Sequence, residues 1–204
     1  TIMAGCLNNP GQANRTTDPT STAGPTQTTT QPSGSPSTPS TTPRMVSSRS
    51  VSIENLSQGN LEKFGLKADA TLLSDTITTQ HPARIRLKLS ASSQTTVSFR
   101  ICRPGDIHEA TNTRNDEKLI LKEGQPRQQT SDCWRINQDQ LFWGRPCYTK
   151  TVTITPDSPF TQEFTIWDHP DNPTCFPTGT YHVKYTPNRN DTVLHWSFDL
   201  LVSK

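Results

Sequence analysis

The strongest constraint on the fold of this chain is a strict alternation of apolar and polar residues. Residues 83–89 read Ala-Arg-Ile-Arg-Leu-Lys-Leu, which places apolar side chains on one face and cations on the other. The same period recurs at residues 96–101, 152–154, 164–166, 181–185 and 194–202, and a helical period fits none of them. A period of two is typical of a β-strand with one buried face. The chain is therefore predicted to be all-β.

Turn residues separate these segments, as in Arg103-Pro104-Gly105-Asp106 and Thr155-Pro156-Asp157. Residues 66–73 form a plausible first strand, and residues 117–123 a short one between the longer segments. Seven or so short alternating strands in one domain indicate two antiparallel sheets packed face to face. We therefore predict an antiparallel β-sandwich over residues 61–204.

The N-terminal part of the chain has a different composition. Residues 16–43 contain no aromatic and no β-branched aliphatic residue, and Asp18 is the only charge. Such a stretch cannot bury enough apolar surface to offset the entropy lost on ordering it. Residues 46–60 show little periodicity. We therefore expect a disordered Ser/Thr/Pro-rich tether over residues 7–60, followed by one domain over residues 61–204.

The first six residues, Thr-Ile-Met-Ala-Gly-Cys, place small residues directly before a single cysteine. This pattern is typical of the end of a lipoprotein signal peptide, so residues 1–6 are predicted to carry a lipid on Cys6. The protein would then lie at the extracellular face of the cell membrane, held there by its lipid. A net charge of +2 with scattered lysines and arginines offers no basic face, so no nucleic-acid partner is expected.

The other four cysteines lie in the predicted domain: Cys102, Cys133, Cys147 and Cys175. An even set in an exported chain predicts two disulfides. A Cys133–Cys147 bridge would close a loop of about 15 residues, which is worth roughly 3 kcal/mol in the chain-entropy model, and we favour this bridge, with Cys102–Cys175 as the second. A four-cysteine zinc site is the alternative, but it requires closely spaced pairs that the chain lacks.

The densest cluster of unusual residues lies between Cys133 and Cys147, the second and third of these cysteines, and just beside them. Aromatic side chains next to arginines stack on sugar rings or anchor protein partners. The structural alternative is that one or two tryptophans plug the end of the sandwich over a disulfide. The candidate binding residues are Trp134, Arg135, Phe142, Trp143, Arg145 and Tyr148.

No motif for catalysis, a resident metal or a cofactor is found. The chain has no Gly-x-Ser-x-Gly elbow, no phosphate-binding glycine loop and no His-Glu-x-x-His. His182 and His195 would approach each other if the last two strands form a hairpin, which would permit a metal pair, but surface histidines without a ligand are the favoured interpretation. Three N-x-S/T sequons make Asn14, Asn55 and Asn190 glycosylation candidates.

Residues 176–183, Phe-Pro-Thr-Gly-Thr-Tyr-His-Val, and the final strand resemble the penultimate hairpin of prokaryotic immunoglobulin-like domains. Together with the Met-Ala-Gly-Cys start and the Thr-rich tether, the chain resembles the surface lipoproteins of prokaryotes, including those of halophilic archaea. The resemblance implies an immunoglobulin-like β-sandwich on a lipid anchor. It departs from true immunoglobulin domains, because the Cys…Trp…Cys spacing of their core disulfide is missing.

These features favour a non-enzymatic surface protein with a binding or envelope-structural role. Its partner would be an envelope protein or glycan, contacted through the loop residues 103–148. A secreted protease inhibitor using the disulfide-bracketed loop is the second hypothesis. A hydrolase or a metal-binding surface domain is the third, since paired carboxylates in a fold need no sequence motif.

Overall fold

The computed structural model describes residues 48–101, 107–124, 133–138, 141 and 147–204. The chain divides into two units, Thr1–Ser40 and Thr41–Lys204, and all described residues belong to the second. The predicted lipid site at Cys6 and the sequon at Asn14 lie outside the described residues, as does the predicted tether up to residue 47.

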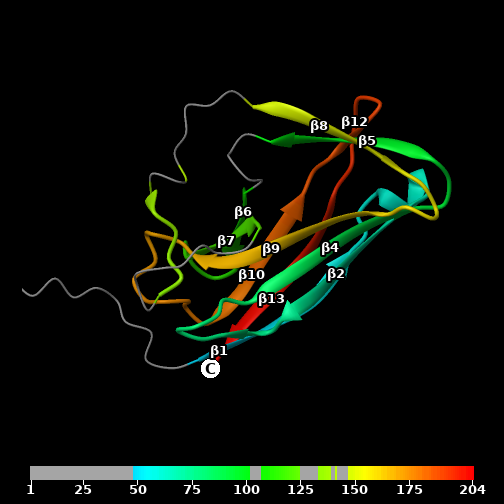
Figure 1. Ribbon diagram of the computed structural model, residues 1–204. Helices are drawn as coiled ribbons and strands as arrows, with labels where there is room; N and C mark the ends of the chain where they lie inside the picture. Colours follow the sequence, from blue (N-terminus) through cyan, green and yellow to red (C-terminus); the bar gives the residue numbers. More distant parts are fainter. Residues whose placement is uncertain (1–47, 102–106, 125–132, 139–140, 142–146) are drawn as a thin grey trace, which may run out of the picture. The chain divides into compact units, whose positions relative to one another are not determined.

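The described part is built almost entirely of antiparallel strands, which confirms the all-β prediction (Figure 1). One short 3₁₀ helix, η1 (Leu61–Phe64), joins the first two strands. The strands are β1 (Arg49–Ser57), β2 (Leu66–Ser74), β3 (Thr76–Ile77), β4 (Arg84–Ala91), β5 (Thr95–Ile101), β6 (Ile107–Asn112), β7 (Lys118–Glu123), β8 (Tyr148–Ile154), β9 (Phe160–Asp168), β10 (Gly179–Tyr185), β11 (Asn188–Arg189), β12 (Thr192–Val193) and β13 (Trp196–Ser203).

Two sheets form the sandwich. The larger has nine strands in the order β2-β4-β9-β7-β6-β10-β13-β1-β3, and the smaller has four in the order β12-β11-β5-β8. The small sheet packs on the large one through aromatic contacts such as Phe99 with Phe160, whose ring centroids lie 5.0 Å apart. The predicted antiparallel β-sandwich is therefore confirmed.

The large sheet curls until its two ends meet, which makes the sandwich a near-barrel. β3 follows directly after β2 and pairs with β1, so β1 lies beside both ends of the sheet. At the far end of β1, the Gln58 side chain bonds both the N–H and the C=O of Ala68 in β2, each at 2.8 Å. These contacts hold β1 against β2 without a continuous strand ladder among the described residues.

The predicted start of the domain at residue 61 is wrong, because β1 lies within the range predicted as tether. β1 pairs with β13 from Ser50↔Ser203 to Ser57↔Ser197. Its backbone hydrogen bonds, rather than its side chains, account for its place in the sheet, since only Val51 of the strand is fully buried. One buried residue in nine leaves too weak an alternation to be recognised in the sequence.

Aromatic side chains fill the space enclosed by the large sheet. Tyr181, Phe164 and Phe198 are among the largest fully buried residues. The hydroxyl of Tyr181 donates to the carbonyl of Pro177 at 2.7 Å, four residues earlier in the chain. This is the arrangement known as a tyrosine corner in immunoglobulin-like sandwiches. It explains why the motif Pro-Thr-Gly-Thr-Tyr stands at the entry to β10.

Candidate binding site at the loop end of the sandwich

A short segment extends the large sheet beyond the point where β4 ends. β4 and β9 pair as far as Arg84↔Thr165. Beyond it, the N–H of Asp168 donates to the carbonyl of Trp134 at 2.9 Å, and the N–H of Ile136 donates to the carbonyl of Asp168 at 3.1 Å. Residues 134–136 therefore take the place that β4 vacates beside β9. We call this end of the large sheet, where β9 ends and β10 begins, the loop end.

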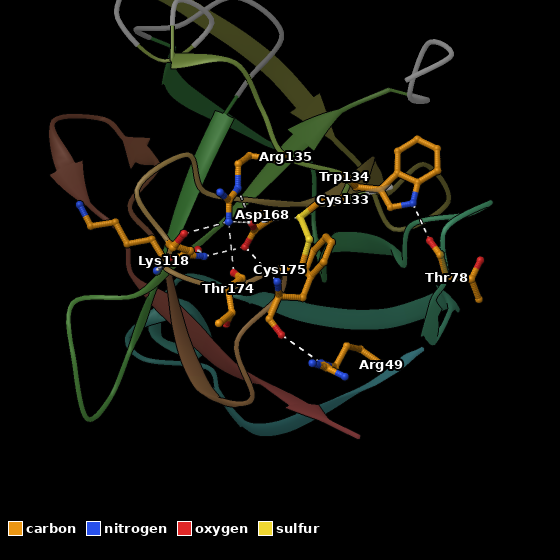
Figure 2. The surroundings of a disulfide bond; sticks show 11 residues. Arg49, Thr78, Lys118, Cys133, Trp134, Arg135, Asp168, Thr174 and Cys175 are labelled. Carbon is orange, nitrogen blue, oxygen red and sulfur yellow. Dashed lines mark hydrogen bonds and ion pairs between the residues drawn. A yellow bond between two sulfur atoms is a disulfide. The ribbon is translucent and has the colours of Figure 1, made fainter. Parts of the chain in front are cut away.

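A disulfide joins that segment to the loop between β9 and β10 (Figure 2). Cys133 pairs with Cys175, and their Cα atoms lie 5.7 Å apart. The predicted Cys133–Cys147 and Cys102–Cys175 pairings are therefore wrong. Loop-closure entropy favoured the short loop, whereas the sheet places residue 133 next to the end of β9 and thus beside Cys175. Cys147 is also disulfide-bonded, and Cys102 lies outside the described residues.

The side chain of Asp168 is the centre of this region and is fully buried. The guanidinium of Arg135 donates to its Oδ2 at 2.7 Å. Asn172 Nδ2 and the N–H of Phe176 donate to its Oδ1 at 2.7 Å and 3.1 Å. Figure 2 shows Arg135 pointing toward Asp168 beside the disulfide. We call Asp168, Arg135, Asn172 and the Cys133–Cys175 disulfide the Asp168 cluster.

Burial and hydrogen bonding act in opposite directions on this carboxyl. Burial raises the pKa of Asp168 above its ordinary value, while the hydrogen bond from Asn172 and the charge of Arg135 oppose that rise. A buried carboxylate needs these donors, because an unpaired charge in the interior is strongly unfavourable. The Asp168 cluster is thus the structural element that joins segment 134–136, the β9–β10 loop and β9.

Two of the six candidate binding residues have structural roles here. Trp134 is 8% exposed, its Nε1 donates to the carbonyl of Thr78 at 2.7 Å, and its ring packs edge-on against Trp167. Arg135 also donates from Nη2 to the carbonyls of Asn172 and Thr174. Trp134 therefore plugs the end of the sandwich beside the disulfide, as the structural alternative predicted. Trp134 and Arg135 are not part of an exposed aromatic–arginine surface. Tyr148, by contrast, is 56% exposed at the start of β8.

The remaining candidate residues are dispersed. Phe142, Trp143 and Arg145 lie outside the described residues. His182 lies opposite Asp199 and contacts it at 2.8 Å, rather than approaching His195. The predicted hairpin exists, but its register places the two histidines at different levels of the sheet. The idea of a histidine pair that holds a metal is therefore wrong.

The two sequons in the described part lie on the surface. Asn55 is exposed with a φ of 50°, and its Nδ2 donates to Asp199 at 2.8 Å. Asn190 is exposed with a φ of 45° in the turn between β11 and β12. Both sites are open to solvent, and glycosylation of them stays a prediction.

A pocket of about 520 Å³, lined mostly by polar residues, opens beside the Asp168 cluster, and we call it the polar pocket. It lies between the β6–β7 turn and the β9–β10 loop. Its lining consists of Asn115, Asp116, Glu117, Lys118, His169, Asp171, Asn172 and Pro173. Except for Lys118 at the start of β7, these residues belong to the two loops, which are far apart in the sequence.

Asn172 connects this pocket to the Asp168 cluster. It is 4% exposed, and its side chain bonds both the N–H and the C=O of Lys118 besides Asp168. On the opposite wall, Glu117 Oε2 accepts hydrogen bonds from the side chains of Asn112 and Asn115. These contacts fix both walls relative to the sheet. The sequence showed residues 168–171 only as a polar turn, and no local signal links that turn to residues 115–118.

The described residues contain no group of three or more His, Cys, Asp or Glu side chains arranged to hold a metal ion. No helix within the described ranges is long and apolar enough to cross a membrane. The comparisons with known proteins give no match, whether to a family model, to a curated sequence or to a solved structure.

Proposed function

We propose that this chain is a non-catalytic binding module, held at the outer face of a cell membrane by a lipid on Cys6, and that the polar pocket binds a sugar of the cell envelope. The observation that carries the proposal is the pocket. Its volume of about 520 Å³ falls in the range of small-molecule sites. Its walls are held by hydrogen bonds to Asn172 and Glu117, so a ligand meets side chains already in place.

The chemistry of the lining supports a sugar. Carboxylates and amides offer planar acceptors and donors to hydroxyl groups, which both donate and accept. Asn115, Asp116 and Asp171 supply such groups at the rim, and Pro173 adds an apolar surface. The lining holds three carboxylates and one lysine, so it disfavours acidic sugars through charge repulsion. Neutral and amino sugars are the expected ligands.

The pocket lies at the end of the domain where β1 begins, which affects how an anchored protein would present it to a ligand. Arg49, the first residue of β1, donates from Nε to the carbonyl of Phe176 at 3.2 Å, so β1 begins at the loop end, where the pocket also lies. An anchor on the chain before β1 would therefore be joined to the domain at the end that carries the pocket. Residues 6–44 span up to ~125 Å when extended, which leaves room for envelope sugars beneath the domain. The Cys133–Cys175 disulfide also suits an oxidising, exported location.

The inhibitor hypothesis rested on a long insertion bracketed by disulfides. Cys133 pairs with Cys175, and Cys147 is also disulfide-bonded, so the bracket joins the insertion to other parts of the fold instead of closing it on itself. No other contact in the described part of the chain favours it over binding at the pocket.

Titration calorimetry of the full chain against a panel of soluble neutral, amino and acidic oligosaccharides tests the proposal. We expect binding of a neutral or amino sugar, weakened about tenfold by Asp116→Ala or Asp171→Ala. The matched control is Asp157→Ala, an exposed carboxylate in the turn between β8 and β9, which should bind as the unmodified chain does. Binding of no sugar, or preference for acidic ones, would overturn the sugar site. Intact mass of membrane-extracted protein separately tests the lipid on Cys6.

A further inference from the structure

The free edge of β8 is the most open backbone edge in the described part of the protein. β8 is the last strand of the small sheet, so one of its edges pairs with β5 and no described strand pairs with the other. In Figure 1 it forms the outer margin of that sheet. β12, at the opposite margin, has only two residues, and the ends of the large sheet meet each other. A regular edge of seven residues is a template for another strand.

Most residues of β8 favour pairing of its free edge with another strand. Thr149, Thr151 and Thr153 are exposed on its outer face, and Val152 is half-buried on the other. Such β-branched residues favour extended structure. The strand's one charge, Lys150, points inward with its Nζ 5.4 Å from the ring centroid of Phe160; an inward charge is a feature that blunts edges, and here the Phe160 ring contacts the ammonium within the chain. The ladder with β5 runs from Thr95↔Ile154 to Ile101↔Tyr148 with no bulge. β8 therefore lacks the bulge that would twist such an edge away from a partner.

We infer that β8 pairs with β8 of a second copy of this chain, antiparallel and about a two-fold axis at Thr151. A two-fold axis perpendicular to the sheet relates identical residues on the same face. Directly paired residues must also share a face. The register must therefore be centred on a residue, which leaves Lys150, Thr151 or Val152 as the centre nearest the middle of the strand.

Charge and length select Thr151 among these three. A centre at Lys150 would place two ammonium groups directly opposite each other, which is unfavourable. A centre at Val152 would leave Tyr148 and Thr149 beyond the paired part of the partner strand. The Thr151 centre pairs all seven residues and sets Lys150 opposite Val152 of the second copy. It also aligns the threonines of both strands on the outer face, where Thr–Thr pairs are favourable.

The expected product is a reversible dimer with a continuous eight-stranded sheet across both small sheets, four strands from each copy. One strand pair buries a small area, so the dimer should form at micromolar rather than nanomolar concentration. The inference uses no residue of the polar pocket and does not depend on the sugar proposal.

Sedimentation equilibrium of the full chain measures dimerisation, and charged substitutions on β8 test the proposed register. Thr151→Lys sets two cations against each other at the axis and should weaken dimerisation by about fivefold or more. Thr149→Lys with Thr153→Lys places like charges in both flanking pairs and should weaken it further. Thr149→Glu with Thr153→Lys places opposite charges in the same pairs and should preserve or strengthen the dimer, in a salt-dependent way.

Thr96→Lys is the matched control, because Thr96 is exposed on the same face but lies on β5, opposite Thr153. It should leave dimerisation unchanged, and circular dichroism should show all variants folded. A monomer at every concentration would overturn the inference. So would equal effects of Thr151→Lys and Thr96→Lys, or loss of the dimer in the Thr149→Glu with Thr153→Lys variant.

Discussion

Two carboxylates in this protein contact arginines at nearly the same distance, and yet their pKa values shift in opposite directions. At the loop end, Arg135 and Asp168 lie 2.7 Å apart with the carboxylate fully buried. On the outer face of the large sheet, Glu163 receives Arg86 at 2.6 Å and Arg84 at 2.8 Å, with its side chain 38% exposed. Burial raises the pKa of Asp168, whereas the hydrogen bond from Arg86 lowers that of Glu163. Solvent, rather than distance, decides what each pair contributes.

The difference in burial gives the two carboxylates different roles: Asp168 holds the fold together, and Glu163 is a surface residue. Asp168, in β9, is hydrogen-bonded to segment 134–136 and to the β9–β10 loop. Because its side chain is fully buried, water cannot replace a lost hydrogen-bond partner. Glu163 joins two neighbouring strands that are already paired through their backbones. Exposed pairs of this kind contribute little to stability. The loop end should therefore be sensitive to single substitutions that the outer face tolerates.

The largest expected effect is that of Arg135→Ala. It leaves the Asp168 carboxylate buried without its cation, and we expect the free energy of unfolding to fall by about 3–5 kcal/mol. Urea denaturation of the variant and the unmodified chain measures this. In Arg135→Met with Asp168→Asn, which removes both charges, much of the loss should be recovered. A loss below about 1 kcal/mol in Arg135→Ala would show that the two ion pairs do not differ as described.

The Cys133→Ala with Cys175→Ala variant should have the next largest effect. The bridge spans 42 residues, and loss of such a constraint on the unfolded chain typically costs about 2–4 kcal/mol. Thermal unfolding measures the loss, and substitution is preferable to a reductant because Cys147 is in a disulfide as well. If the variant unfolds as the unmodified chain does, the hydrogen bonds of Asp168 alone hold the loop end together.

The smallest effects, those of pH, should have opposite signs in the two regions. The raised pKa of Asp168 means that the folded state binds its proton more tightly, so its contribution to stability is complete below pH 3.8 and falls as pH rises through the folded pKa. The lowered pKa of Glu163 gives a contribution present above pH 4.5 and lost as pH falls.

Two charge-removing variants measure these contributions. The destabilisation caused by Asp168→Asn should shrink as pH rises, and that caused by Glu163→Gln should grow as pH rises and remain small throughout. Denaturation at a series of pH values measures both. Slopes of the same sign would contradict the comparison.

The same contrast explains how much the sequence could predict. Strands such as β4 and β13 bury alternate residues on one face, so the pattern alone reveals them, and the sandwich follows. The Tyr181 hydrogen bond to Pro177 is local, and its motif was visible in the chain. β1 is held mainly by backbone hydrogen bonds, which leave no mark on the side-chain pattern.

The candidate site was harder to predict because its contacts are remote in the sequence. The sequence indicates only a polar turn at residues 168–171 and gives Asn172 no role, and the fold shows that Asp168 and Asn172 are buried against Arg135 and Lys118. The cysteine pairing failed for the same reason, since the sheet brings residues 42 apart together where entropy favours the nearer partner. Local chemistry was predictable here, and long-range polar pairing was not.

The contact of Arg49 with Phe176 also determines how this molecule would carry a mechanical load. A ligand gripped in the polar pocket and the chain that enters at β1 are attached to the same end of the sandwich. Tension between them would load the Arg49–Phe176 contact and the first pairs of β1 with β13, which lie at the same end of the sandwich. The molecule would then act as a short link under tension, and the enclosed aromatic core would lie off the line of force.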